Sequence, residues 1–222
     1  MEKIVKIKEL ENVTHDVLRI ATEKPAGLTY SPGQAVDIAI NNPDWKKEIR
    51  TFTFTSLPDD DYVEFTIKTY TSHNGVTNQL RSLKVGDELA LYDVYGSIAY
   101  KGEGIFLAGG AGITPFLAIL RSLEKQGKTG GNKLIFANRT KADIIRENTF
   151  KKMLGNNFIN VLSDEKSPGY EYGYISAELI KKHIDEHTKY FYVCGPDPMM
   201  VAMEKHLSNL GISFDFIVKE AF

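Results

Sequence analysis

The chain has 222 residues with a formal net charge of −2, and 42% of its residues are hydrophobic and 25% charged. This length and balance are ordinary for a globular enzyme of one large or two small domains, and the lack of positive charge argues against a nucleic-acid-binding protein. No apolar run approaches the roughly 20 residues that span a bilayer, and the first residues lack a secretory signal, so we expect a cytoplasmic protein without membrane insertion.

Short strands separated by turns dominate the first hundred residues. Residues 35–40 alternate at period two, and residues 51–55 alternate threonine with phenylalanine, which is typical of strands. Further strands are expected at residues 4–13, 17–21, 62–70 and 88–92. Strands at this spacing predict a six-stranded antiparallel β-barrel, which we assign to a domain spanning residues 1–101.

After residue 102 the pattern changes to strands that alternate with helices. Strands are expected at residues 105–108, 134–137, 158–162, 190–193 and 214–218, and helices at residues 116–125, 176–184 and 198–210. This alternation predicts a doubly wound α/β domain over residues 102–222, in which helices cover both faces of a parallel sheet. We assign no metal site in either domain.

Two glycine-containing turns follow buried strands of the second domain. Residues 109–112 (Gly-Gly-Ala-Gly) follow one strand, and residues 194–196 (Cys-Gly-Pro) follow another. A glycine turn between a strand and a helix lets backbone N–H groups approach a pyrophosphate. Thr114 is expected to cap a helix that Pro115 begins. Together the turns predict a nicotinamide dinucleotide site.

Four segments of the chain resemble, in order, the motifs of the ferredoxin–NADP reductase family, which includes cytochrome b5 reductases and flavodoxin reductases. The segments are residues 50–53 (Arg-Thr-Phe-Thr), 67–80, 109–115 and 194–199. Members of this family pair a six-stranded flavin-binding barrel with a nicotinamide-binding α/β domain. The resemblance therefore implies the same division of labour between the two domains predicted here.

By this resemblance the barrel domain binds FAD. Arg50 would bind the flavin phosphate, Phe52 would stack on the isoalloxazine in place of the usual tyrosine, and Thr53 would place its hydroxyl at flavin N5. The turn at residues 75–77 would hold a pyrophosphate, which implies FAD rather than FMN. The implied FAD-binding residues are Arg50, Thr51, Phe52, Thr53, Ile67, Lys68, Tyr70, Gly75, Val76, Thr77 and Thr114.

The resemblance also implies which residues meet the nicotinamide coenzyme and which take part in catalysis. The implied coenzyme-binding residues are Gly109, Gly110, Gly112, Ile113, Thr114, Pro115, Asn138, Arg139, Ser163, Asp164, Cys194, Gly195, Pro196 and Met199. Besides Thr53, the catalytic candidates are Cys194 beside the nicotinamide, and Glu220 and Phe222 near the flavin. The alternative for Cys194 is a small buried hydrophobic residue.

Two residues give opposing indications about the coenzyme. Arg139 follows the second strand of the α/β domain, where an arginine can accommodate a 2′-phosphate; its alternative is a solvated surface charge. Asp164 and Glu165 follow the next strand, where NADPH-specific relatives typically carry Ser-Arg, and their carboxylates would repel a phosphate dianion. The sequence slightly favours NADH over NADPH.

The expected reaction is hydride transfer from NAD(P)H to FAD, followed by release of single electrons. The chain has one cysteine, too few for an iron–sulfur cluster of its own, so the acceptor should be a separate protein such as flavodoxin, ferredoxin or a haem protein. Two alternatives stay open: a flavin reductase that uses free flavin as substrate, and an electron-transfer subunit without independent turnover.

Overall fold

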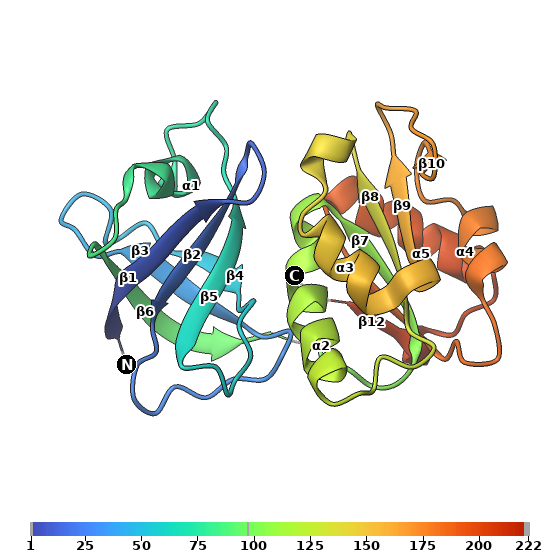
Figure 1. Cartoon of the computed structure of the whole chain (residues 1–222), viewed down its shortest axis with the longest axis horizontal. Helices are drawn as coiled ribbons and strands as arrows, with labels where there is room; N and C mark the ends of the chain where they lie inside the picture. The colour runs from blue at the N-terminus through green and yellow to red at the C-terminus, as the bar shows by residue number, and fades with distance from the viewer. Residues whose placement is uncertain (1, 97, 220–222) are drawn as a thin grey trace. The chain divides into compact units, whose positions relative to one another are not determined.

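The computed structural model describes residues 2–96 and 98–219, and the chain divides into two compact units, Met1–Gly96 and Ser97–Phe222 (Figure 1). The predicted boundary at residues 101 and 102 falls in the segment that joins the last strand of the first unit to the first strand of the second. Glu220 and Phe222, both expected near the flavin, lie outside the described residues.

The first unit is an antiparallel six-stranded sheet that closes on itself. Its strands are β1 (Lys3–Asn12), β2 (Val17–Glu23), β3 (Ala35–Ile40), β4 (Arg50–Thr53), β5 (Tyr62–Lys68) and β6 (Glu88–Tyr95), and helix α1 (Val76–Gln79) with the 3₁₀ turn η1 (Leu80–Ser82) lies between β5 and β6. The strand order is β4-β3-β6-β1-β2-β5. An isolated antiparallel bridge between Phe54 and Phe65 joins the two end strands. The predicted barrel is confirmed.

Aromatic side chains fill the core where the barrel closes. Phe54 and Phe65 are fully buried, and their ring centroids lie 5.5 Å apart. Tyr30 stacks on Phe54 at 3.9 Å, and its hydroxyl donates a hydrogen bond of 2.9 Å to the carbonyl of Leu57. A buried tyrosine needs such a partner for its hydroxyl, and Tyr30 has it in this core.

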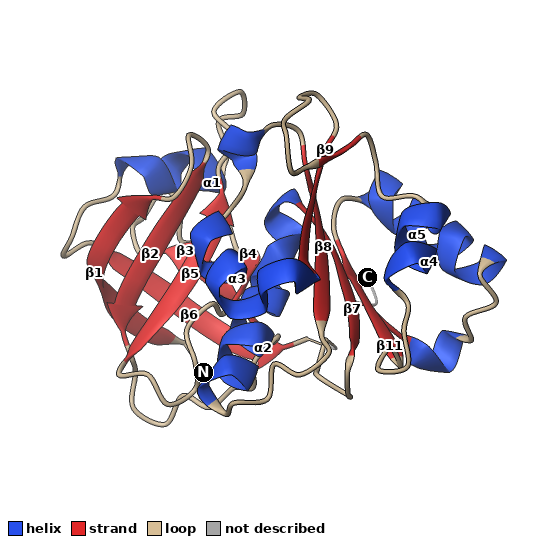
Figure 2. Cartoon of the chain, turned by 45° about the vertical axis from the view of Figure 1, so that its right-hand side comes forward, coloured by secondary structure: helices blue, strands red, loops and turns tan. Residues whose placement is uncertain are grey.

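The second unit is a parallel sheet with helices on both faces. Its strands are β7 (Gly104–Gly109), β8 (Lys133–Asn138), β9 (Phe158–Leu162), β10 (Glu171–Tyr172), β11 (Tyr190–Cys194) and β12 (Ile217–Lys219). Its helices are α2 (Thr114–Lys125), α3 (Glu147–Leu154), α4 (Ala177–His183) and α5 (Asp197–Asn209), with 3₁₀ turns η2 (Gly110–Ile113), η3 (Lys141–Asp143), η4 (Gly155–Asn157) and η5 (Phe214–Phe216). Figure 2 shows α2 and α3 on one face of the sheet and α4 and α5 on the other. The predicted doubly wound fold is confirmed.

The strand order β10-β9-β8-β7-β11-β12 places the reversal of winding between β7 and β11. From β7 the chain moves through β8 to one side, and it later returns to the other side with β11. In open α/β sheets, ligands bind beyond the carboxyl ends of the strands at this kind of switch point. The topology therefore brings the two predicted glycine turns to the same place.

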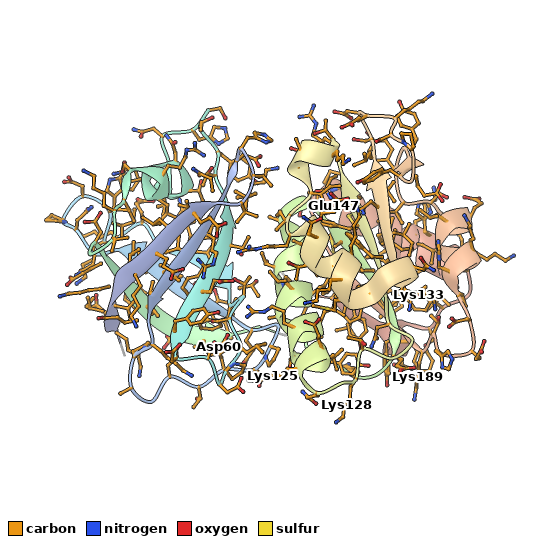
Figure 3. All side chains as sticks on the ribbon, in the orientation of Figure 1. Asp60, Lys125, Lys128, Lys133, Glu147 and Lys189 are labelled. Carbon is orange, nitrogen blue, oxygen red and sulfur yellow. The ribbon has the colours of Figure 1, made fainter. Side chains whose placement is uncertain are left out.

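The structure differs from the sequence-based elements at three places, one of which is the short strand β10, which was not expected from the sequence. The last strand begins at Ile217 rather than at residue 214, because residues 214–216 form a 3₁₀ turn. The Ser213 hydroxyl caps this turn by accepting a hydrogen bond from the Asp215 N–H. Helix α3 was not predicted from the sequence. Its Glu147, labelled in Figure 3, pairs with Lys151 at 2.8 Å and accepts a hydrogen bond from the Tyr170 hydroxyl, so contacts beyond the helix itself support its first turn.

Candidate functional site

The two glycine turns of the second unit pack directly against each other. Strands β7 and β11 are parallel neighbours in register, with Ala108 opposite Cys194. A Cβ atom at Gly112 would collide with the Cys194 carbonyl oxygen and lie 2.6 Å from the amide nitrogen of Gly195. One at Gly195 would lie 2.7 Å from Met199 Sδ. The close approach of two backbones therefore requires glycine at 112, while glycine at 195 leaves room for the Met199 side chain.

Gly110 is different, because nothing lies within 4 Å of the position that its Cβ would occupy. Its φ of +52° is a left-handed conformation that favours glycine. It opens the turn η2, which leads into helix α2, and no side chain caps that helix. The Thr114 N–H of α2 already donates to the Ala111 carbonyl and Pro115 has no N–H, so the groups that an anion can approach are those at the start of η2, which no side chain caps.

Thr114 does not cap helix α2 as predicted. It is the first residue of the helix, and its hydroxyl donates a hydrogen bond of 3.1 Å to the carbonyl oxygen of Ala111 in the preceding turn. Pro115 follows as the second helical residue. The prediction was wrong because the 3₁₀ turn η2 already has helical dihedral angles at Ile113, which leaves the capping position to a residue without a polar side chain.

The side chain of Asn138 lies at the carboxyl end of β8, the neighbour of β7. It is 8% exposed, and neither its amide nitrogen nor its amide oxygen has a hydrogen-bond partner among the described residues. A buried amide without partners is costly, and such a group in a native protein calls for a water or a ligand. Asn138 therefore offers one donor and one acceptor site at the edge where a dinucleotide would lie.

Arg139 and Asp164, which gave opposing indications in the sequence, form an ion pair. Arg139 Nε lies 2.8 Å from Asp164 Oδ2, and the Asp164 amide donates to the Arg139 carbonyl at 2.8 Å. The Ser163 hydroxyl donates to the other carboxylate oxygen at 2.6 Å. This hydrogen bond and that of Arg139 hold the pKa of Asp164 below its usual range. Both side chains reach solvent, with exposed fractions of 79% for Arg139 and 41% for Asp164.

In the first unit, strand β4 carries the predicted flavin motif. The Arg50 guanidinium is exposed, donates to the Ile49 carbonyl at 2.7 Å and pairs with Glu48 at 3.3 Å. Phe52 is half-buried and packs against the barrel core. Successive residues of a strand point to opposite faces, so Thr53 lies on the outer face with Thr51.

Two residues beside this motif were not singled out from the sequence. The Thr51 hydroxyl donates to Asp37 at 2.6 Å, and the Tyr95 hydroxyl donates to the same carboxylate oxygen at 2.6 Å. Val36 and Ile38 of the same strand point into the barrel core, which places Asp37 on the outer face. Tyr95 is 58 residues away from Asp37 in the chain, and only the strand order brings it there.

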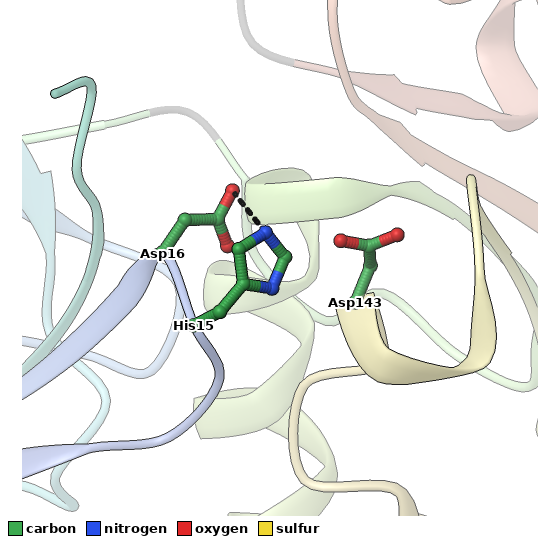
Figure 4. A group of neighbouring side chains, drawn as sticks. All are labelled: His15, Asp16 and Asp143. Atoms are coloured by element: carbon green, nitrogen blue, oxygen red, sulfur yellow. Dashed lines mark ion pairs between the residues drawn. The ribbon is translucent and has the colours of Figure 1, made fainter. Parts of the chain in front are cut away.

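The second predicted flavin segment begins at the end of β5. Lys68 pairs with Asp16 at 3.0 Å, and Asp16 also lies 3.8 Å from His15 (Figure 4). Partial burial raises the pKa of Asp16, but the hydrogen bond and charge of Lys68 outweigh it and hold the pKa low. Asp143, also drawn in Figure 4, belongs to the second unit, where its carboxylate caps the turn that begins after Thr140.

The rest of this segment forms a turn that leads into helix α1. Ile67 and Val76 are buried in the barrel core, so only their backbone groups can meet a ligand. Tyr70 is 48% exposed, and its ring lies nearly parallel to that of His73. Gly75 precedes α1 with φ −115°, and no atom lies within 4 Å of the position of its Cβ. Neither backbone conformation nor packing requires glycine at position 75.

Comparisons with known proteins agree with this architecture. Residues 4–100 match the family model of the oxidoreductase FAD-binding domain, and residues 106–205 match that of the oxidoreductase NAD-binding domain. NADH-cytochrome b5 reductase 1 of Aspergillus terreus is 31% identical over 228 residues, which cover 92% of this chain and 76% of that protein. The reductase component of propane 2-monooxygenase from Rhodococcus jostii is 29% identical over 234 residues, which cover 98% of this chain and 62% of that protein.

Solved structures show the same fold at lower identity. The flavohaem-like FAD/NAD-binding domain of nitric oxide dioxygenase from Vibrio cholerae superposes with a TM-score of 0.86 at 22% identity, covering 99% of this chain and 98% of that one. A ferredoxin NADP⁺ reductase from Neisseria gonorrhoeae gives 0.83 at 18% identity with the same coverage. None of the helices in the described parts has the length and apolar character to cross a membrane. The chain belongs to the ferredoxin–NADP reductase family of FAD- and NAD-binding oxidoreductases.

Proposed function

We propose that this oxidoreductase takes electrons from NADH and passes them through FAD to a separate electron-acceptor protein. When bound, FAD accepts an electron pair from the nicotinamide and releases electrons one at a time. The observation that carries the proposal is the switch point of the second unit, where the open turn at Gly110, which no side chain caps, lies at the end of the strand next to Asn138. Among the described residues the Asn138 amide lacks a hydrogen-bond partner, which a dinucleotide would supply.

The coenzyme pyrophosphate is proposed to lie against Gly110 and the start of the turn η2. The closely packed glycines at 109, 112 and 195 fix the position of this turn relative to the carboxyl end of β11. Met199 Sδ packs against two of them and so holds the turns together. Cys194 ends β11 and is half-buried, which leaves its side chain partly accessible beside the proposed nicotinamide position.

The Arg139–Asp164 pair favours NADH over NADPH. A 2′-phosphate at Arg139 would have to displace a carboxylate whose lowered pKa keeps it charged at neutral pH, and would then lie beside that carboxylate. The ribose hydroxyls of NADH, in contrast, can donate hydrogen bonds to an ionised Asp164. The similarity to a protein named as an NADH-cytochrome b5 reductase supports the same preference.

FAD is proposed to bind along the free edge of β4. Phe52 and Thr53 lie on opposite faces of this strand, so a flat ring can meet both side chains only if it lies across the strand edge. The Arg50 guanidinium is exposed and its pair with Glu48 is at the surface, so turning toward a phosphate costs little. Gly75 fits a pyrophosphate, because the position of its Cβ is open and its N–H lies at the start of α1 without a side-chain cap.

The acceptor is proposed to be a separate protein, such as cytochrome b5, another haem protein, flavodoxin, ferredoxin or an oxygenase component. The relatives are named for cytochrome b5 and for a monooxygenase system, and the single cysteine of this chain cannot build an iron–sulfur cluster. A flavin reductase would release its flavin, and a subunit without turnover would not be reduced by coenzyme.

One experiment separates these functions. The purified protein is incubated with FAD and passed through gel filtration. The reduction of the flavin that stays bound is then followed by its absorbance under anaerobic conditions, with NADH and with NADPH separately. We expect FAD to stay bound and NADH to bleach it faster than NADPH. Subsequent oxidation by added cytochrome b5 or ferredoxin identifies the class of acceptor. Loss of flavin on the column would favour the flavin reductase, and failure of both coenzymes to bleach bound FAD would refute the proposed reaction.

A further inference from the structure

Three side chains from three strands meet on the outer face of the barrel beside the flavin motif. Asp37 of β3 accepts hydrogen bonds of 2.6 Å from Thr51 of β4 and from Tyr95 of β6, both at the same carboxylate oxygen. The Thr51 and Tyr95 hydroxyls also contact each other. The strand register explains the meeting, because Asp37 lies opposite Thr51 and Ala35 lies opposite Tyr95.

Among the described residues, the Asp37 carboxylate has no cationic partner. Within residues 2–96 and 98–219, no lysine, arginine or histidine forms an ion pair with it. Its two partners are neutral hydroxyl groups, which stabilise the carboxylate but leave its net charge in place. Holding three surface side chains in one arrangement costs conformational entropy, and hydrogen bonds at the surface return little stability. The stability of the barrel alone gives little reason for this network.

The network lies next to the residue expected at flavin N5. Thr53 follows Thr51 by two residues and therefore shares its face of β4. On that face Asp37 and Thr53 are diagonal neighbours on adjacent antiparallel strands, a separation of roughly 7–8 Å. A negative charge at this range opposes the uptake of electrons by a bound flavin, because reduction adds negative charge to the ring.

We propose that Asp37 is a positioning residue for FAD: with Tyr95 it fixes Thr51 on the outer face of β4, and its unneutralised carboxylate lowers the midpoint potential of the bound flavin. The proposal rests on the proposed FAD site at β4. It gives the acidic side chain on β3 a function in electron transfer, since a lower potential makes reduced FAD a stronger donor to the acceptor.

The variant Asp37→Asn removes the negative charge of Asp37 but keeps an oxygen atom that accepts the hydrogen bonds of Thr51 and Tyr95. An amide oxygen can accept both hydroxyl hydrogen bonds, so the variant keeps the geometry and loses the charge. We expect its bound FAD to have a more positive midpoint potential than the wild type, measured by equilibration with a redox dye and a chemical reductant, with an FAD Kd within about twofold of wild type. Asp61→Asn removes an equal charge from an exposed turn of the same barrel and is expected to leave the midpoint unchanged.

Tyr95→Phe provides a readout of opposite sign. This variant keeps the Asp37 charge but removes one of the donors that offset it, so its midpoint is expected at or below the wild-type value. A general loosening of the barrel would not separate the two variants in this way. An Asp37→Asn midpoint equal to that of the wild type, release of FAD by Asp37→Asn, or a positive shift in Tyr95→Phe would each overturn the proposal.

The test is independent of turnover with coenzyme. The midpoint is measured with a chemical reductant, so a wild-type protein that binds FAD but is not reduced by NADH would refute the proposed function and leave the Asp37 test intact. Conversely, normal NADH oxidation with an unshifted Asp37→Asn midpoint would overturn only this inference.

Discussion

Replacing Gly75 with alanine is expected to weaken FAD binding while leaving the stability of the protein unchanged. The φ of −115° is allowed for alanine, and the added Cβ meets no atom within 4 Å. Alanine is a poorer residue than glycine before a helix by roughly 0.5–1 kcal/mol. It also reduces the entropy of the unfolded chain, which stabilises by roughly 0.4–1 kcal/mol. The two effects offset each other, so the free energy of unfolding should change by less than about 0.5 kcal/mol.

The same methyl group would occupy the space through which a pyrophosphate reaches the backbone at the start of α1. Losing one charge-assisted hydrogen bond there costs about 1.5–3 kcal/mol, which corresponds to a roughly 10- to 150-fold higher Kd for FAD. Fluorescence titration of the apoprotein with FAD measures the affinity, and urea unfolding of the same apoprotein measures the stability. An unchanged Kd would refute the role of Gly75 in binding, and a large loss of stability would show that its surroundings are not open to a methyl group.

Gly112→Ala is the matched comparison for this experiment. Its Cβ would collide with backbone atoms of Cys194 and Gly195, which cannot move as a flexible side chain can. We expect a loss of roughly 1–3 kcal/mol in the free energy of unfolding, accompanied by weaker coenzyme binding. Together the two variants separate a glycine required by a ligand from a glycine required by packing.

Three further variants or conditions test the remaining assignments. Thr53→Ala should slow reduction of bound FAD by NADH roughly threefold to tenfold in stopped-flow measurements without changing coenzyme affinity, and an unchanged rate would argue against its position at the flavin. Asp164→Asn frees Arg139 and removes a repulsive charge, so the ratio of kcat/KM for NADPH to that for NADH should rise roughly fivefold or more; a constant ratio would count against the pair as the determinant. Folding lowers the pKa values of Asp16 and Glu147, so both carboxylates stabilise the protein above about pH 4–5, and this stabilisation is lost as the pH falls further. Thermal unfolding measured from pH 7 to pH 3 tests this, and the variant Asp16→Asn is expected to lose less stability over that range than the wild type.

The local motifs are predictable from the sequence because each depends on residues that are close in the chain. A glycine turn after a buried strand, or alternating threonine and phenylalanine, specifies a backbone shape that adjacent residues impose by themselves. The apolar run that precedes Gly109 and Gly110 is therefore enough to place both glycines at the end of a strand. It does not reveal why each is glycine, because Gly109 contacts Met199 across the switch point whereas Gly110 has open space around its Cβ position.

Contacts between strands that are distant in sequence could not be predicted from the sequence. The Arg139–Asp164 pair joins the ends of β8 and β9, and the two residues appeared in the sequence only as conflicting indications about a phosphate. The Asp37–Tyr95 hydrogen bond depends on β6 lying beside β3, an order that the pairing of consecutive strands does not give. Thr114 illustrates the same limit locally, since a 3₁₀ turn before the helix moved the capping position by one residue.

The glycines of the two motifs therefore carry two kinds of information. At 112 the absent side chain lets two backbones of the same unit approach each other, whereas at 109 and 195 it leaves room for the Met199 side chain, so substitution at 112 in particular reports on folding. At 75 the surroundings are open within the protein and the dihedral angles are ordinary, so the fold favours glycine over alanine only through its position before α1, and a loss of ligand affinity on substitution reports on a bound group. Gly110 combines an open surrounding with a left-handed φ, so its substitution should affect both properties. An alanine scan that measures stability and ligand affinity on each variant is thus expected to show a fall in affinity alone at Gly75 and a fall in both properties at Gly110.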